Sequence, residues 1–329
     1  MPPNSAAPRR GETPSSAGEG CVLCPRACGA HRAEGERGVC RVDGRMLVAR
    51  AALHRWEEPV ISGQRGSGTV FFSGCPLGCV YCQNAPIAEA RAGIEASVAD
   101  LARMCLSLQG QGALNVSLVT ATPFAPQVVQ AVACARRAGL DVPVVWNTSG
   151  YEAEATLRLL RDTVDVWLPD FKYADADLAA RYSHAPDYPQ VALRALRAMA
   201  DQAGSPCFDE VDGAPRMTSG VLVRHMMLPG GLDASRRAVR LLWDEFGNSV
   251  GYSLMSQYTP VLASRARAGD GRAARVLQSC PELAGRVAAE EYEALLDFAD
   301  RLGIDDYFWQ EGDPADESFI PAWDGTGVR

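Results

Sequence analysis

Six short apolar runs alternate with helical patterns from residue 69 onward, and this alternation limits the possible folds more than any other feature of the chain. Strands that alternate with helices are typical of βα units, in which the strands form a parallel sheet. Each run is short and mostly apolar, as expected for a strand that is buried on both faces. The predicted strands are Thr69–Ser73, Asn115–Val119, Val142–Asn147, Val164–Leu168, Val221–Met227 and Ser249–Met255.

The segments between these strands carry the apolar spacing of amphipathic helices, and Gly139 is placed to end one of them. The predicted helices are Val98–Gln109, Ala125–Ala138, Tyr151–Arg161, Pro189–Gln202 and Ala234–Phe246, with Glu290–Leu302 near the C-terminus. Six strand–helix units are too few to close an eight-stranded barrel. The pattern therefore predicts an α/β domain built on a parallel sheet.

Three cysteines, Cys75, Cys79 and Cys82, lie within eight residues directly after the first predicted strand. Thiolates are soft ligands, and three of them can hold three irons of a [4Fe–4S] cluster while the fourth iron stays open. A structural zinc site normally takes four protein ligands, and no histidine is close in sequence, so a cluster is the better match. Pro76 and Gly78 favour the bends that a chain needs in order to wrap around a cofactor.

The spacing C-x3-C-x2-C, with Tyr81 before the last cysteine, resembles the signature of the radical S-adenosylmethionine (SAM) enzymes. The resemblance implies that SAM chelates the open iron through its amino and carboxylate groups, and that Tyr81 lies near the adenine. It also implies that an electron from the reduced cluster cleaves SAM to methionine and a 5′-deoxyadenosyl radical, which abstracts a hydrogen atom. An external donor of the flavodoxin or ferredoxin type would supply the electron.

The same resemblance implies a fold, a partial (β/α)6 TIM-like barrel in which the chemistry lies at the carboxyl ends of the strands. After the second strand, Thr120-Ala121-Thr122-Pro123 stands where many radical SAM enzymes carry a Gly-Gly-Glu-Pro turn that contacts the SAM amino group. Because the acid is missing here, the candidate acceptors for that ammonium are Thr120 and Thr122. An ordinary strand-ending turn is the alternative.

Polar side chains follow the third and fourth predicted strands: Asn147 and Ser149 after one, Asp170 and Lys172 after the other. Similar segments in activating enzymes for glycyl-radical proteins contact SAM or line the substrate cavity. The resemblance therefore implies a cofactor contact for the first pair and a catalytic role for the second. At i, i+2 spacing, Asp170 and Lys172 could instead form a structural ion pair, but the carboxyl end of a strand favours a site.

The fifth strand carries Arg224 and His225, and by alternation one of the two side chains points inward. Arg224 is the candidate, because its planar guanidinium suits the SAM carboxylate or ribose, whereas a histidine here is as readily packed and hydrogen-bonded. After the sixth strand, Gln257 and Tyr258 are candidates to contact the adenine or the substrate, and we assign Gln257 to cofactor binding.

Four further cysteines, Cys21, Cys24, Cys28 and Cys40, lie within twenty residues near the N-terminus. Four thiolates are a complete ligand set for a structural zinc ion or a second [4Fe–4S] cluster, and the spacing does not choose between them. The segment also resembles the N-terminal part of an incompletely characterised branch of the pyruvate-formate-lyase-activating-enzyme homologues. The expected divisions are a disordered tail (1–20), a cysteine-rich metal-binding segment (21–60) and a barrel with a C-terminal extension (61–329).

Charge and composition exclude some classes of partner. The net charge is −8 and no block of Lys and Arg stands out, which argues against direct binding to nucleic acid. No apolar run reaches the roughly 18 residues that span a bilayer, so we expect no membrane association. Eleven cysteines, several of them in groups, suit metal binding in a reducing cytoplasm better than disulfides.

These features predict a cytoplasmic radical SAM enzyme of the pyruvate-formate-lyase-activating type, with Cys75, Cys79 and Cys82 as the cluster ligands. If it activates a glycyl-radical enzyme, the target glycine lies on another polypeptide. A small molecule or a peptide is an equally allowed substrate. The alternative from a different class is a non-catalytic iron–sulfur or zinc protein that transfers electrons or acts as a scaffold.

Overall fold

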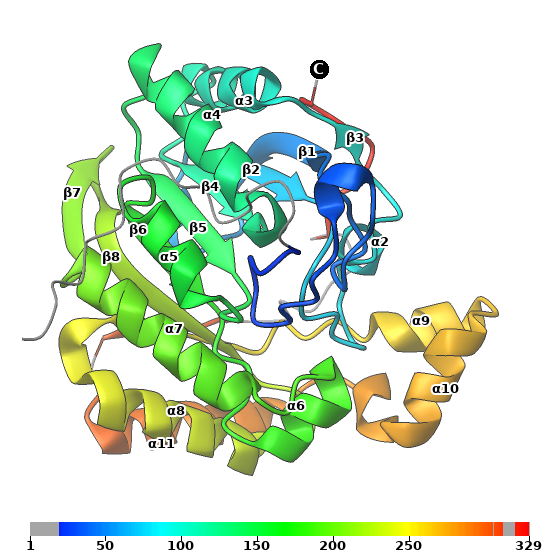
Figure 1. Ribbon diagram of the computed structural model, residues 1–329. Coiled ribbons are helices and arrows are strands. Elements are labelled where there is room, and N and C mark those ends of the chain that lie inside the picture. The colour runs from blue at the N-terminus through cyan, green and yellow to red at the C-terminus, as the bar shows by residue number, and fades with distance from the viewer. Residues whose placement is uncertain (1–19, 305, 312–319, 329) are drawn as a thin grey trace, which may run out of the picture.

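The computed structural model describes residues 20–304, 306–311 and 320–328. The tail expected at residues 1–20 therefore lies outside the described residues, except for Gly20. The described chain forms one sheet with helices packed against it (Figure 1). Among the described residues, no helix is both long enough and apolar enough to cross a membrane.

The strand order in the sheet is β10-β9-β8-β6-β5-β4-β2-β1-β3. Neighbouring parallel strands form the middle of this sheet. Each of the six predicted strands overlaps one of these parallel strands. Their bounds are β2 (Ser67–Phe72), β4 (Val116–Val119), β5 (Val144–Thr148), β6 (Val166–Pro169), β8 (Ala214–Met226) and β9 (Gly251–Met255). The prediction of an α/β fold with a mostly parallel sheet is confirmed, and the arrangement is consistent with a partial barrel.

The edges of the sheet carry strands that the sequence pattern did not predict. They are β1 (Leu47–His54), β3 (Ile94–Glu95), β7 (Cys207–Val211) and β10 (Tyr307–Phe308). β1 pairs antiparallel with β2, and β7 forms a hairpin with β8. Because β1 falls within the segment expected at residues 21–60, that segment and the parallel strands share one sheet.

The helices lie largely where the periodicity placed them. Those that match predictions are α3 (Val98–Gly110), α4 (Ala125–Arg137), α5 (Glu154–Leu160), α7 (Tyr188–Ala203), α8 (Leu232–Phe246) and α11 (Ala289–Leu302). The others are α1 (Pro59–Ser62), α2 (Ala85–Ala88), α6 (Ala176–Ser183), α9 (Val261–Arg267) and α10 (Gly271–Ser279), with 3-10 turns at Arg32–Glu34, Thr122–Phe124, Gly247–Ser249 and Pro281–Ala284. α5 begins three residues later than predicted, so Tyr151 and Glu152 belong to the loop after β5.

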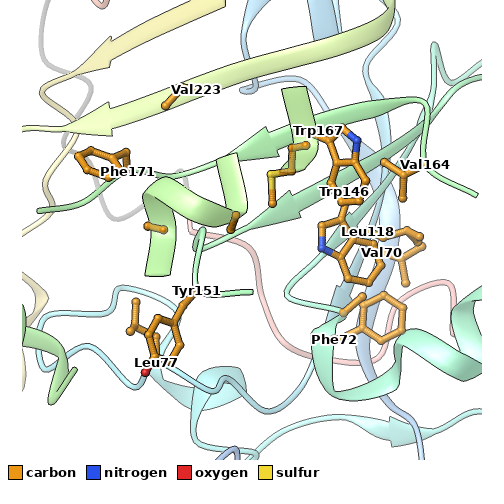
Figure 2. Packing of buried hydrophobic residues seen from close by; sticks show 14 of the residues in the cluster. Val70, Phe72, Leu77, Leu118, Trp146, Tyr151, Val164, Trp167, Phe171 and Val223 are labelled. Atoms are coloured by element: carbon orange, nitrogen blue, oxygen red, sulfur yellow. The ribbon is translucent and has the colours of Figure 1, made fainter. Parts of the chain in front are cut away.

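The core lies between the sheet and its helices, and its largest fully buried side chains include Trp146 and Trp167 on adjacent strands (Figure 2). The same cluster extends to Val42 and Met46, which precede β1. Burial of apolar surface stabilises the fold by roughly 25 cal/mol per Å². A shared core therefore makes the N-terminal segment part of the same folded unit.

A C-terminal strap, residues 320–328, is attached to β1 by backbone hydrogen bonds. The amide of Ala51 donates to the carbonyl of Thr326 at 2.8 Å, and the amide of Gly325 donates to that of Ala49 at 3.0 Å. Trp323 packs edge-on against Phe71 of β2 with ring centroids 5.1 Å apart. These contacts hold the strap beside the carboxyl end of β2.

Candidate functional site

The loop after β2, which contains residues 75–82 and is called the cysteine loop below, begins at a glycine with no room for a side chain. Gly74 has φ +95°, and a Cβ there would meet the carbonyl oxygen of Cys40 at 2.9 Å. Positive φ is accessible to glycine at little cost. The chain can therefore turn sharply at the end of β2 while it touches the N-terminal segment.

The three sulfurs of the cysteine loop line one cavity of about 240 Å³ at the carboxyl ends of the parallel strands. Burial, together with the nearby Cys79 thiol, raises the pKa of the Cys75 thiol, and backbone N–H groups of Gly78 and Leu77 oppose that rise. Burial is also the main cause of the raised pKa of Cys82. The three thiols thus lie close together in a region that is largely shielded from water.

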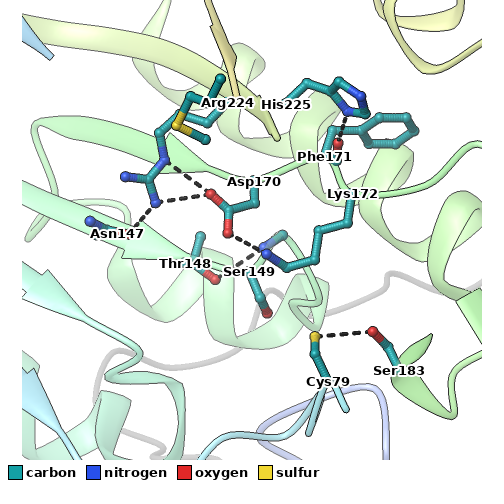
Figure 3. Close-up of polar contacts among 12 residues, drawn as sticks. Cys79, Asn147, Thr148, Ser149, Asp170, Phe171, Lys172, Ser183, Arg224 and His225 are labelled. Carbon is teal, nitrogen blue, oxygen red and sulfur yellow. Dashed lines mark hydrogen bonds and ion pairs between the residues drawn. The ribbon is translucent and has the colours of Figure 1, made fainter. Parts of the chain in front are cut away.

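The hydroxyl of Ser183, at the end of α6, donates a hydrogen bond to Cys79 Sγ at 3.0 Å (Figure 3). Ser183 is linked in turn to the Tyr173 hydroxyl at 2.9 Å, and Tyr173 to the Tyr81 hydroxyl at 2.7 Å. Hydrogen bonds to cluster sulfurs are one of the means by which proteins set cluster potentials. Within the described residues, no three His, Cys, Asp or Glu side chains already surround a single-ion position.

This donor set suits an iron–sulfur cluster. Soft thiolates are the ligands that such clusters take, three are present on one loop, and backbone and hydroxyl donors face their sulfurs. Cys75, Cys79 and Cys82 could therefore hold three irons and leave a fourth facing the cavity that all three line.

A connected group of charged side chains forms another part of the cavity wall (Figure 3). Asp170 lies between Lys172, whose Nζ is 2.6 Å from its carboxylate, and Arg224, at 2.9 Å. Arg224 also pairs with Glu57 at 2.9 Å and donates to Asn147 Oδ1 at 2.6 Å. We call these five residues, four of them charged and one an amide, the charged group. Their two carboxylates and two cations compensate each other in charge.

Burial by itself would raise the pKa of Asp170, but Lys172 and Arg224 outweigh it and lower that pKa below its usual range. The pKa of Glu57 is shifted in the opposite direction. Its burial raises its pKa, Arg224 opposes the rise, and the charge of Asp170 adds to it. Because Arg224 already binds several partners, its main effect in this structure is to hold the other polar side chains in position.

Glu57 is a charged site residue that the sequence analysis missed. It follows β1, which is antiparallel to β2, whereas the predicted site residues lie on or after the parallel strands. The available signal was local: two acidic residues, Glu57 and Glu58, stand directly before Pro59 at the start of α1. Both carboxyl groups are buried.

Most of the other predicted site residues line the same cavity. They are Tyr81, Thr120, Asn147, Ser149, Asp170, Lys172, Arg224 and Gln257. Tyr258 also lines it, packed edge-on against Tyr81 with ring centroids 6.1 Å apart. The structure thus brings together residues from several strand ends of the sheet.

The structure separates the two threonines that follow β4. Thr120 lines the cavity with φ +58°, a left-handed conformation that is uncommon outside glycine. Thr122 begins the 3-10 turn after it, and its hydroxyl donates to Glu152 at 2.7 Å, inside the core. Because Thr122 is buried and does not line the cavity, it is poorly placed to meet a SAM ammonium.

On β8 the alternation of side chains is as predicted. Arg224 points to the cavity, whereas His225 is buried on the other side with Nδ1 2.8 Å from the carbonyl oxygen of Phe171. Burial lowers the pKa of His225, which favours the neutral ring. This histidine is a packed core residue.

Comparison with known proteins identifies a family whose model matches the part of the chain that carries this site. Residues 69–228 match the model of the Radical SAM superfamily, a range that runs from β2 through the cysteine loop to just beyond β8. Residues 69–228, just under half of the chain, are therefore similar to a radical SAM domain. For that superfamily such a domain implies a [4Fe–4S] cluster and SAM.

Individual relatives are distant. An uncharacterized protein of Methanocaldococcus jannaschii is 25% identical over 293 residues, which cover 87% of this chain and 75% of that protein. A radical SAM methyltransferase from Sphaerobacter thermophilus is similar in structure at 14% identity and a TM-score of 0.48, covering 78% of this chain and 69% of its own. Streptococcus suis SuiB bound to precursor peptide SuiA has 12% identity and a TM-score of 0.45, covering 72% and 46%.

Proposed function

We propose that this protein is an enzyme that cleaves SAM reductively at a [4Fe–4S] cluster held by Cys75, Cys79 and Cys82. The observation that carries the proposal is that these three thiols share one cavity with the charged group, in a chain whose residues 69–228 match the Radical SAM superfamily model. When bound, the reduced cluster supplies the electron that converts SAM to methionine and a 5′-deoxyadenosyl radical.

The chain's own part is to bind and orient SAM. An ammonium has three donors, and Lys172 Nζ donates to Asp170, so it can also receive the SAM carboxylate. Asn147 and Ser149 line the same cavity wall and offer amide and hydroxyl groups. Arg224 keeps Asp170 and Asn147 in place, which makes it a positioning residue for this contact.

Apolar and aromatic side chains supply the dry part of the cavity. Tyr81, Tyr258, Met226 and Met255 line it, and Tyr81 and Tyr258 are almost fully buried. A flat aromatic surface suits the adenine of SAM, and exclusion of water protects a reactive radical from side reactions. This supports the expectation that the adenine lies near Tyr81 and Gln257.

Anaerobic reconstitution tests the chemistry. With dithionite and SAM, the loaded protein should produce 5′-deoxyadenosine and methionine, and Cys79→Ala should abolish both products. Cys207→Ala is the matched control, because Cys207 is exposed on the β7 hairpin. A protein with full iron and sulfide content that releases no 5′-deoxyadenosine would instead be a non-catalytic iron–sulfur protein.

We propose that the substrate is a glycine of a partner enzyme, from which a hydrogen atom is abstracted. This follows from the resemblance to pyruvate-formate-lyase-activating enzymes. The cavity mouth includes Trp56, which is 65% exposed, and the apolar strap residues Ile320 and Pro321. An apolar rim of this kind suits contact with a polypeptide.

A partner whose glycines carry deuterium distinguishes glycyl-radical activation from other reactions. Activation predicts deuterium in the 5′-deoxyadenosine and a glycyl radical signal in the electron paramagnetic resonance spectrum of the partner. Where a glycyl-radical enzyme is encoded beside this protein, that enzyme is the partner to test. Unlabelled 5′-deoxyadenosine without a radical signal would direct the search to a small-molecule or peptide substrate.

A further inference from the structure

The four N-terminal cysteines lie in two tight turns or directly beside them. In one turn the amide of Ala27 donates to the carbonyl of Cys24 at 3.0 Å, and in the other the amide of Arg41 donates to that of Gly38 at 2.8 Å. The amide of Cys21 joins the chain to Ala30 at 3.0 Å. Each turn ends in a left-handed residue, with φ +40° and +69°.

The sulfurs face one another across these turns. A Cβ built on Gly38 would lie 2.9 Å from Cys28 Sγ and 3.7 Å from Cys40 Sγ, so both sulfurs lie close to one point. The Cys24 thiol is near those of Cys40 and Cys21, and the Cys40 thiol is near those of Cys21 and Cys28. All four are free thiols.

Backbone and side-chain donors surround this group. The amide of Arg26 hydrogen-bonds the Cys24 sulfur, and the amide of Val42 hydrogen-bonds the Cys40 sulfur, each from two residues further along. The buried guanidinium of Arg32 lies 3.9 Å from Cys21 Sγ. These donors would stabilise the excess negative charge that four thiolates around a divalent cation carry.

We propose that Cys21, Cys24, Cys28 and Cys40 bind one Zn²⁺ in a structural site separate from the cavity. Four thiolates complete a tetrahedron and leave no open position, which is the pattern of structural zinc. Among the described residues the four sulfurs do not meet at the ligand distances of a single ion, so metal binding would require their side chains to move closer together.

The site is placed to hold the cysteine loop through Arg26. This arginine lies between Cys24 and Cys28, and its guanidinium donates to the carbonyls of Pro76 at 2.9 Å and Leu77 at 3.2 Å. It also donates to the carbonyls of Ser183 at 3.0 Å and His184 at 2.6 Å. One side chain thus ties the turn that carries it to two backbone segments.

The segment held by Arg26 includes Ser183, whose hydroxyl donates to Cys79 Sγ. Zinc would fix the turn between Cys24 and Cys28, and with it the direction of the guanidinium. Arg26 is therefore a positioning residue: it keeps the cysteine loop and the end of α6 at a fixed separation.

Metal analysis of a protein without the cavity cysteines tests the zinc site independently of the proposed function. In a Cys75→Ala, Cys79→Ala, Cys82→Ala variant we expect about one zinc per chain and no iron or sulfide. Adding Cys28→Ser should lower the zinc content at least tenfold, whereas adding Cys134→Ser on α4 should not. Iron and sulfide in place of zinc, or no metal at all, would overturn the proposal.

Cobalt substitution in the wild-type protein tests the zinc site even if the multiple variant does not fold. Wild-type protein whose zinc has been exchanged for Co²⁺ should show the intense thiolate-to-cobalt charge-transfer absorption of a tetrahedral four-sulfur site. Wild-type protein without that absorption would contradict the assignment.

Arg26→Ala tests the mechanical link, with Arg37→Ala, an exposed arginine of the same segment, as the control. The Arg26 variant should keep its zinc, lose about tenfold or more in affinity for iron at the cysteine loop, and show faster proteolysis within residues 75–82. The proteolysis readout needs no cluster, so it stands even if the proposed SAM chemistry fails. Unchanged proteolysis and iron loading would overturn the role of Arg26.

Discussion

Asp170 is the residue through which the charged side chains of the cavity are connected. It contacts Lys172 and Arg224, and only a fifth of its side chain is exposed. Removing one partner from a buried ionic network leaves the others uncompensated, which costs more than the loss of a surface pair. Its carboxylate thus affects both stability and the position of the site cations.

We predict that Asp170→Asn lowers the free energy of unfolding by about 3 kcal/mol, because it keeps the size of the side chain but removes its charge. The matched control is Asp209→Asn, which breaks the surface pair with Arg216 and should cost about 1 kcal/mol or less. Urea unfolding followed by circular dichroism measures both. Equal losses in the two variants would contradict the assignment of Asp170 to a buried network.

The stability contribution of Asp170 should depend on pH in a defined direction. Its folded-state pKa is lowered, so the contribution is present above the unfolded-state pKa of about 3.9 and is lost as the pH falls through the lower folded-state value. The difference in unfolding free energy between wild type and Asp170→Asn should therefore be constant above about pH 5 and shrink below about pH 4. A difference that grows in acid would contradict this sign.

Ser183 provides a third prediction at this scale. Its hydroxyl donates to Cys79 Sγ, and a donor to a ligand sulfur stabilises the reduced, more negative cluster. Ser183→Ala should lower the reduction potential of the reconstituted cluster, as measured by electron paramagnetic resonance in a redox titration. Tyr173→Phe, which removes the next hydroxyl but leaves the sulfur contact, should produce a smaller shift. A raised potential in Ser183→Ala would refute this role.

At the scale of elements, the C-terminal strap depends on glycine. Gly327 has φ +72°, and a Cβ there would lie 1.9 Å from the carbonyl oxygen of Ala51 on β1. The strap also supplies Ile320 and Pro321 to the cavity mouth. Its attachment therefore affects both the edge of the sheet and the entrance to the site.

Gly327→Ala should detach the end of the strap, because the new methyl group overlaps the backbone of β1. Gly269→Ala is the matched control: its φ is also positive, at +91°, but a Cβ there meets nothing within 4 Å. It should show only the cost of backbone strain, about 1–3 kcal/mol. Hydrogen exchange of the Ala51 amide measures the detachment, and exchange as slow as in wild type would contradict it.

At the scale of the whole molecule, one hydrophobic core joins the N-terminal segment to the parallel sheet. Val42 belongs to the same buried cluster as Leu118 of β4. Apolar contact across the two parts means that neither loses its packing alone. We therefore expect a single cooperative unfolding transition for the described chain.

Leu118→Ala should lower the unfolding free energy by about 2–5 kcal/mol, because it leaves a cavity among fully buried side chains. Tryptophan fluorescence reports the core and protease cleavage within residues 21–40 reports the N-terminal segment, and both midpoints should shift together. The control Val39→Ala, at a half-exposed position, should change stability by about 0.5 kcal/mol or less. Separate midpoints would show two independent units.

Sequence reasoning succeeded where structure follows from local pattern. The strands β5 and β6 and the helices α3 and α4 were predicted closely, because a buried parallel strand is a short apolar run and a surface helix repeats every 3.6 residues. β1 was missed because only the four-residue helix α1 follows it and its burial pattern is mixed. Thr122 was assigned to the cofactor because strand-end position does not reveal the direction of a hydroxyl.

The sequence by itself determined the alternation of strands and helices and the spacing of the cysteine loop, because both depend on near neighbours in the chain. Only the tertiary structure decided that Glu57 meets Arg224, 167 residues away, and that Arg26 reaches Leu77 and Ser183. Such contacts depend on the order of strands in the sheet and on how its edges are covered. Neither is encoded in any local spacing of side chains.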